Sequence, residues 1–321
     1  MSLTRRAFAK SLLAAPVATG GLTLALSTMA ADAISSPPPH AEVRIGRFTV
    51  HVLTDGYHDM PYGFFTGQPT DVTAAQAEAN HVNRTGGALR LGFAQYLIED
   101  GDRRILVDTG PAGGIGENTG KLPAALGAFG IGPDDIDAVI LTHTHFDHIS
   151  GAVRGDTAVY GSAEVYVDRR DIAYFTDPAA RSSAPDFLLS SFDATADLVR
   201  LYPRLQRIKG DHDILLGLST VDLTGHTPGH IGVRIEDGGQ SMLIVSDMLF
   251  HPLVHPVRAD IGFVFEQDPA AAEAMRARFF PLAAESGGLV AATHMPFPGL
   301  GRIGRDGDAL RWVPENWAYE S

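Results

Sequence analysis

The sequence contains no cysteine among its 321 residues. Disulfide bonds are therefore excluded, and so are thiol nucleophiles, thiolate zinc ligands and cysteine-held iron–sulfur clusters. Any catalytic or metal-binding chemistry must come from other side chains. Hydrophobic residues make up 45% of the chain, which is ample for the buried core of one large domain or two small ones.

Positive charge is also scarce. The chain has 25 lysine and arginine residues against 38 aspartate and glutamate residues, which gives a formal net charge of −13. Lys10, Lys121 and Lys209 are its three lysines. An acidic surface repels phosphate backbones, so we expect no nucleic-acid partner.

Long apolar runs are missing after the first 33 residues. At the N-terminus, Arg5 and Arg6 precede a run of small and apolar residues that ends at Ala31-Asp32-Ala33. This pattern resembles a twin-arginine export signal with an A-x-A-type cleavage site. It predicts a signal peptide over residues 1–33 and a periplasmic or secreted protein with no stable membrane partner after cleavage. The alternative is an uncleaved membrane anchor.

A proline-rich stretch follows this signal. Three consecutive prolines lie within residues 34–41, which we interpret as a linker. From 42 to 321, strand-like and helix-like segments alternate without a second linker, so we expect one domain of α/β (α+β) class. Alternation predicts a strand at 43–50 and a hairpin at 95–107. Helical periods occur at 73–80, 121–129, 168–175 and 268–282.

Four apolar runs end just before a side chain that can bind a metal ion. The runs are residues 138–142, 220–224, 242–246 and 289–293, and the side chains are His143, His226, Asp247 and His294. Buried strands whose ends meet at one edge of packed sheets would bring these side chains together. His226 is preferred over His230 because it comes first after its strand, and His230 is expected to support or pack behind the ligands.

The sharpest signal is the segment H-T-H-F-D-H at residues 143–148. In an extended segment, the side chains of residues two apart point to the same side, so His143 and His145 can bind one ion together. Asp147 and His148 follow where the chain must turn, and from there they can face a second ion. Imidazole nitrogens and carboxylate oxygens suit Zn²⁺ or a similar divalent ion.

These motifs resemble, in order and spacing, those of the metallo-β-lactamase superfamily. The matching pieces are H-x-H-x-D-H at 143–148, G-H-T-P-G-H at 225–230, Ser246-Asp247 and Thr293-His294. The resemblance implies a four-layered αβ/βα sandwich over residues 42–321. It assigns one metal ion to His143, His145 and His226, and the other to Asp147, His148 and His294, with Asp247 bridging both. It also implies that Asp108 supports the site from behind.

A narrower resemblance, to methyl parathion hydrolases, rests on residues 108–113, 293–301 and 311–314. Those enzymes are exported two-metal hydrolases of phosphotriesters. Where they place an aromatic contact for the leaving group this chain has Ile115, and Tyr174 stands where they carry a larger ring. These departures argue against efficient phosphotriester hydrolysis.

Two divalent ions that share a water lower its pKa towards about 7, so the expected nucleophile is a hydroxide between the ions. Asp147 and Asp247 are the predicted catalytic carboxylates because they hold that pair of ions. Apolar residues beside the ligands favour a neutral, apolar small molecule such as a lactone, an aryl ester or a phosphotriester. The candidate pocket residues are Ile115, Phe146, Tyr174, Phe250, His251 and Phe297.

Two alternatives stay open. Acyl-homoserine lactonases and other lactonases fit the same motifs, although they often carry tyrosine where this chain has Phe250. Di-iron oxidoreductases of the same fold carry glutamate where this chain has His145, and they use a flavin domain that is absent here. Zn²⁺ is the expected metal, with Mn, Co or Fe as alternatives. A homodimer is an open alternative to a monomer.

Overall fold

A computed structural model of the protein describes residues 39–82 and 86–316. The signal expected over residues 1–33 lies outside the described residues, and so does most of the expected linker. The described residues all belong to one compact unit. Its first strand begins at His40, because His40 and Ala41 already pair with Leu53 and Val52. Among the described residues, none of the helices has both the length and the apolar character that crossing a bilayer requires.

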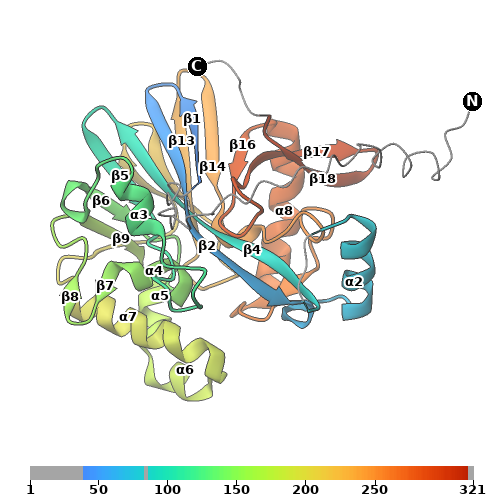
Figure 1. Ribbon diagram of the computed structural model, residues 1–321, viewed down its shortest axis with the longest axis horizontal. Coiled ribbons are helices and arrows are strands. Elements are labelled where there is room, and N and C mark those ends of the chain that lie inside the picture. The colour runs from blue at the N-terminus through green and yellow to red at the C-terminus, as the bar shows by residue number, and fades with distance from the viewer. Residues whose placement is uncertain (1–38, 83–85, 317–321) are drawn as a thin grey trace, which may run out of the picture. The chain divides into compact units, whose positions relative to one another are not determined.

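In the described part of the chain, two seven-stranded sheets form the core of this unit (Figure 1). The first sheet has the order β1 (His40–Ile45), β2 (Phe48–Pro61), β4 (Ala88–Asp100), β5 (Arg103–Val107), β6 (Ala138–Ile140), β9 (Glu164–Asp168) and β10 (Gln206–Ile208). The second has the order β11 (His212–Leu215), β12 (Leu218–Asp222), β13 (Ile231–Asp237), β14 (Gln240–Ile244), β16 (Leu289–Ala291), β17 (Leu300–Asp306) and β18 (Ala309–Pro314). Short pairs join β3 (Phe65–Thr66) to β15 (Gly262–Phe263) and β7 (Val153–Arg154) to β8 (Thr157–Ala158).

The two sheets bury apolar side chains against each other. Val50, Tyr96 and Ile105 of the first sheet belong to the same buried cluster as Val233 and Ile244 of the second. Residues two apart on a strand face the same side, so each strand presents an apolar row to the opposite sheet. This inner cluster forms the middle of the core.

Helices cover the outer faces of both sheets (Figure 1). Leu126 of α3 (Leu122–Gly127) and Leu198 of α7 (Leu189–Leu201) pack on the outer face of the first sheet, and Phe280 of α8 (Pro269–Ser286) packs on that of the second. The order of layers is therefore helix, sheet, sheet, helix, which confirms the predicted αβ/βα sandwich. The remaining helices and turns are α2 (Thr70–Ala79), α4 (Phe146–Ile149), α5 (Arg169–Phe175), α6 (Pro178–Ser183), η1 (Tyr62–Phe64), η2 (Pro133–Asp135), η3 (Ser150–Ala152), η4 (Asp186–Leu188) and η5 (Ser246–Met248).

Most of the expected elements are present. The four predicted helices correspond to α2, α3, α5 and α8, and the predicted hairpin is β4 and β5. The single strand expected at 43–50 is wrong, because the chain turns between β1 and β2 at Gly46, whose φ is 56°. Glycine adopts this left-handed conformation without steric cost, so the turn can be tight.

Candidate metal centre

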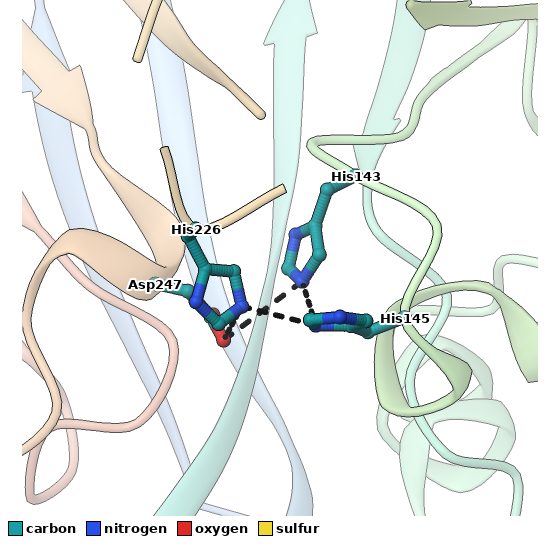
Figure 2. Close-up of side chains that lie close together, drawn as sticks. All are labelled: His143, His145, His226 and Asp247. Atoms are coloured by element: carbon teal, nitrogen blue, oxygen red, sulfur yellow. Dashed lines mark hydrogen bonds and ion pairs between the residues drawn. The ribbon is translucent and has the colours of Figure 1, made fainter. Parts of the chain in front are cut away.

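Four strand ends meet at one place. His143 and His145 follow β6, His226 follows β12, Asp247 follows β14 and His294 follows β16. Figure 2 shows His143 and His145 reaching in from one part of the chain, and His226 and Asp247 from another, so that all four point toward one another. The expectation that buried strands deliver these side chains to one edge is confirmed.

His143, His145, His226 and Asp247 form a first group of potential ligands, and all four are buried. His143 Nε2 and His226 Nε2 each lie 3.0 Å from His145 Nδ1. Asp247 Oδ2 lies 3.1 Å from His226 Nε2 and 3.8 Å from His143 Nε2. One donor atom from each residue lies within 4.8 Å of the others, which is the spacing of ligands around a shared ion.

Asp147, His148 and His294 form a second group beside the first. His294 Nε2 is 3.4 Å from Asp147 Oδ2 and 3.3 Å from Asp247 Oδ2. His148 Nε2 is 3.2 Å from Asp247 Oδ1. Asp247 therefore contacts both groups. The structure brings together all seven residues that the sequence motifs single out.

Outer hydrogen bonds decide which ring nitrogen faces the cluster. His148 Nδ1 donates to Asp108 Oδ2 at 2.8 Å, and His294 Nδ1 donates to the carbonyl oxygen of Gly92 at 2.9 Å. These acceptors leave Nε2 of both rings with its lone pair directed inward. His148 Nε2 is buried without a hydrogen-bond partner among the described residues. Converging lone pairs and carboxylates fit two divalent metal ions.

The charges of the cluster also suit cations. Burial, and then the neighbouring His148, lower the pKa of His143 well below its usual value, so its ring is neutral. Burial opposes ionisation of Asp147, but His148 and His294 outweigh it and lower the pKa of Asp147 to about 2. The neutral His143 ring and the ionised Asp147 carboxylate are in the protonation states that bind divalent metals. Burial opposes protonation of His148 and His294, but the neighbouring carboxylates, Asp247 first, raise the pKa of both rings, so a bound cation must displace their protons.

Asp108 and His230 lie behind the cluster, where they were expected. Asp108 accepts hydrogen bonds from the backbone N–H and the hydroxyl of Thr142, both at 2.8 Å, as well as from His148. His230 lies 3.2 Å from the carbonyl oxygen of Leu223 through Nδ1 and stands outside both ligand groups. Burial lowers the pKa of His230 to about 3, so it is a neutral packing residue.

Asp171 supports the site, although no sequence pattern marked it. This fully buried carboxylate of α5 accepts from Thr144 N and Thr227 Oγ1, each at 2.9 Å, and from Gly229 N. It thereby ties the loop of residues 143–148 to the loop of residues 225–230. In the sequence it occupies an ordinary helix position, and only the fold shows which loops it joins.

A cavity of about 400 Å³ opens onto the cluster. His145, Asp147, Asp247 and His294 form part of its lining. The rest of its wall is mostly apolar and includes Met60, Phe64, Leu91, Phe93, Ile115, Phe146, Phe187, Phe263 and Phe265. A larger groove beside β1, β14 and β16 contains none of the seven clustered residues. An apolar cavity with a few convergent polar groups is the usual form of a small-molecule site.

Two of the six candidate pocket residues, Ile115 and Phe146, line this cavity. Phe250 and His251 do not line it, and both are buried. The ring of Phe250 is stacked on His294 at a centroid distance of 5.6 Å. Sequence proximity to a ligand therefore did not predict which side chain faces the cavity.

Tyr174 and Phe297 also lie outside this cavity lining. The ring of Tyr174 packs against Phe175 and Phe192, with centroids 5.0 and 5.9 Å apart. Phe297 is 40% exposed on the surface. Phe187, Phe263 and Phe265 supply the aromatic wall instead, and they come from segments that showed no metal or catalytic motif.

Comparisons with known proteins agree with this geometry. The family model of the metallo-beta-lactamase superfamily matches residues 94–294, so the chain belongs to that superfamily. Its fold, its family and its cluster of histidines and aspartates define a candidate site for two metal ions of the kind found in that superfamily.

Individual relatives are more distant. The N-acyl homoserine lactonase AiiB of Agrobacterium fabrum is 26% identical over 179 residues, covering 48% of this chain and 62% of that protein, which is less than two thirds of its length. The crystal structure of hydrolase AbOPH, in the beta lactamase superfamily, is 25% identical with a TM-score of 0.80, covering 87% of this chain and 98% of that one. AidC, a dizinc quorum-quenching lactonase, has a TM-score of 0.77 at 22% identity, covers 88% of this chain and 99% of its own, and shows the shared fold.

Proposed function

We propose that this protein hydrolyses neutral, apolar small molecules at an ester, lactone or phosphotriester bond. The observation that carries the proposal is the apolar cavity whose lining includes the metal-binding cluster. Among the described residues that line it there is no lysine or arginine. A substrate carboxylate or phosphate would therefore find no lysine or arginine to anchor it, which favours an uncharged substrate.

Different residues of the chain would bind the metal ions and the substrate. We assign one ion to His143, His145 and His226, the other to Asp147, His148 and His294, with Asp247 shared, and Zn²⁺ fits this set of nitrogen and oxygen donors. When bound, such ions lower the pKa of a shared water and polarise the substrate's oxygen. The aromatic wall holds the substrate's apolar groups and excludes water from them.

Relatives support a lactone or aryl ester as the first substrate to test. AiiB and AidC are named as lactonases, and the aromatic rings of Phe187 and Phe265 lie 4.9 Å apart on the cavity wall, where an aryl group could pack. The C-terminal motif at residues 293–301 supports a kinship with methyl parathion hydrolases, and the hydrolase AbOPH shares the fold. With Ile115 on the wall, we expect phosphotriesters to be slower substrates.

A substrate panel tests the proposal. A lactone, phenyl acetate and methyl parathion are compared by kcat/KM on one zinc-loaded sample, beside a phenyl ester that carries a carboxylate. We expect hydrolysis of the neutral lactone and aryl ester, with the anionic ester at least about tenfold slower, equivalent to 1.4 kcal/mol. A preference for the anionic ester, or no hydrolysis of any neutral compound, would overturn it.

The identity of the metal and the export of the protein are two further proposals. Elemental analysis of the purified protein is expected to find zinc, whereas iron with oxygen consumption would favour the di-iron oxidoreductase. For export, the motif at Arg5 and Arg6 supports a twin-arginine signal over residues 1–33. Replacing both arginines with lysine is expected to retain the protein in the cytoplasm, which cell fractionation measures.

A further inference from the structure

Gln267 joins two histidines of the metal centre. Its backbone N–H donates to the carbonyl oxygen of His226 at 2.9 Å, and its side-chain Oε1 lies 3.1 Å from Nε2 of His145. Its side-chain nitrogen donates to the carbonyl oxygen of Phe265 at 2.6 Å. His226 and His145 belong to the same ligand group, so one residue touches two members of that group from behind.

These contacts determine the hydrogen on the ring of His145. The carbonyl oxygen of Phe265 can only accept, so the amide of Gln267 must direct its NH₂ group there and its oxygen toward His145. His145 Nε2 must then donate, which leaves the lone pair on Nδ1. Nδ1 is the atom that lies 3.0 Å from both His143 Nε2 and His226 Nε2.

The segment that carries Gln267 is held at both ends. Arg276 of α8 is 1% exposed, donates through Nε to the carbonyl oxygen of Ala259 at 2.8 Å, and forms a buried ion pair with Glu266. At the other end, the backbone N–H of Asp268 donates to the carbonyl oxygen of Gly225 at 3.3 Å. The position of Gln267 is therefore set by contacts on both sides of it.

We propose that Gln267 is a positioning residue of the metal centre. By accepting the Nε2 hydrogen of His145 it fixes the ring so that Nδ1 faces the ion held by His143, His145 and His226. Loss of the amide frees the ring to rotate and to carry its hydrogen on Nδ1. The ion of this first group is then held more weakly than the ion of Asp147, His148 and His294.

Metal retention tests this inference without any substrate, so a failure of the proposed substrate class leaves it standing. We expect Gln267→Leu to weaken the retention of one of the two zinc ions by roughly 10–100-fold in competition with a chelator. Gln68→Leu is the matched control. The Gln68 amide bonds Thr73 and Gln76 at 2.9 and 3.0 Å, and none of these three residues belongs to the ligand groups.

Gln267→Glu separates positioning from general damage to the fold. Glutamate keeps an acceptor toward His145 but replaces the donor to Phe265 with an oxygen that this carbonyl repels. Its loss of zinc retention should therefore be clearly smaller than that of Gln267→Leu. The absorption spectrum of the cobalt-substituted protein should change in Gln267→Leu and stay like wild type in Gln267→Glu. Wild-type retention by Gln267→Leu, equal losses in Gln68→Leu, or equal losses in Gln267→Glu would each overturn the inference.

A second, independent observation concerns the cavity wall. His58 and Met60 of β2 line the cavity together with Leu91 and Phe93 of β4, whereas Asp59 does not. This alternation shows that the side chains at 58 and 60 face the cavity. Outside the metal cluster, His58 is the one ionisable residue among the described lining residues, and its ring has no hydrogen-bond or ion-pair partner among them.

His58 stands away from the bond that would be cleaved. The ring of Phe93 contacts His294 edge-on with centroids 5.2 Å apart, and Leu91 lies two residues from Phe93, roughly 7 Å along the strand. His58 is paired with Leu91 on the neighbouring strand. Resting on the proposed function, we infer that His58 hydrogen-bonds a polar acceptor carried by the substrate several bonds from its ester or lactone group.

Five phenyl esters with the same reaction centre test this role. Phenyl heptanoate is compared with phenyl 5-, 6- and 7-oxo-octanoate and their parent octanoate, so that a ketone is added remote from the ester. We expect the kcat/KM of wild type for one of the keto esters to exceed its kcat/KM for the parent octanoate by a ratio of roughly three to ten. His58→Leu should bring that ratio to about one, and Met60→Leu should keep it. Absence of a preference in wild type, or its survival in His58→Leu, would overturn the inference; hydrolysis of no ester would overturn the proposed function with it.

Discussion

The two sheets supply the metal centre in different ways. The first sheet delivers four of the seven clustered residues on one loop, residues 143–148 after β6. The second delivers three, His226, Asp247 and His294, on separate loops after β12, β14 and β16. The first half therefore carries its ligands in one compact sequence motif, whereas the ligands of the second half come together only once β12, β14 and β16 lie in the same sheet.

The two halves are also supported differently from behind. The first loop rests on the buried carboxylates of Asp108 and Asp171, which accept hydrogen bonds from Thr142, His148 and Thr144. His294 of the second half relies on a backbone carbonyl oxygen, that of Gly92 in β4. Substitution of Asp108 can therefore weaken the support of the first loop selectively, whereas Asp171 also accepts hydrogen bonds from Thr227 and Gly229 of the second half.

The largest effect is expected at Asp247, the residue of the second half that contacts both ligand groups. Asp247→Ala removes the carboxylate shared by His226, His148 and His294, so we expect hydrolysis to fall by well over the roughly 10–100-fold typical of outer contacts. His143→Ala should act similarly. Activity of a folded, zinc-treated protein measures this, with the exposed Asp306→Ala as control. Full activity in either cluster variant would refute the assignment.

Asp108→Asn tests the support of the first loop. The amide would direct hydrogens toward the donors Thr142 Oγ1 or His148 Nδ1, so we expect zinc affinity to fall by roughly 10–100-fold. Asp55→Asn is a matched control, because Asp55 is equally buried but accepts from the backbone of Gly120 and Leu122. Equal loss of zinc in both variants would mean that Asp108 acts through general stability.

His255 gives a pH-dependent prediction for the second half. Its buried ring contacts the carbonyl oxygen of Ile261 at 2.8 Å, and burial, with Arg276 nearby, lowers its pKa to about 3. The unfolded chain has a histidine pKa of about 6.5, so between these values only the unfolded state takes up the proton. This contribution to stability is complete above pH 6.5 and is lost as the pH falls toward 3.

His255→Gln removes that titration. Between pH 7 and pH 5, wild type should lose about 2 kcal/mol more unfolding free energy than the variant. Denaturant unfolding of both zinc-loaded proteins at the two pH values measures the difference. The metal ligands titrate in both proteins and cancel in the comparison. Parallel losses in the two proteins would show that His255 is not protonated on unfolding in this range.

The smallest effect compares two half-exposed phenylalanines, one from each half. Phe187 is 44% exposed and lines the cavity, whereas Phe297 is 40% exposed and does not. Phe187→Ala should lower kcat/KM for an aryl ester about fivefold, equivalent to roughly 1 kcal/mol of lost apolar contact. Phe297→Ala should change it less than twofold. The reverse order would favour the pocket predicted from sequence.

Several structural features were predictable because their signals are local. Apolar runs of strand length end at 142, 224, 246 and 293, and the structure places a buried strand before each of the four expected ligands. Periodicity also located α2, α3, α5 and α8. In contrast, α6 and the hairpin turn at Gly46 were missed, because α6 has only six residues and the turn lies within an alternating stretch. α7 was also missed, although it has thirteen residues.

The sequence by itself determined the chemical types at the centre, since histidine and aspartate at the spacing of 143–148 have few roles besides binding a metal. Only the tertiary structure decided what surrounds them. Asp171, Phe187 and the segment that carries Phe265 and Gln267 lie apart in the sequence, and packing alone sets which side chains face the cluster or the cavity. Whether a side chain can bind a metal ion depends on its own chemistry. The shape of a cavity wall depends on how several segments pack together.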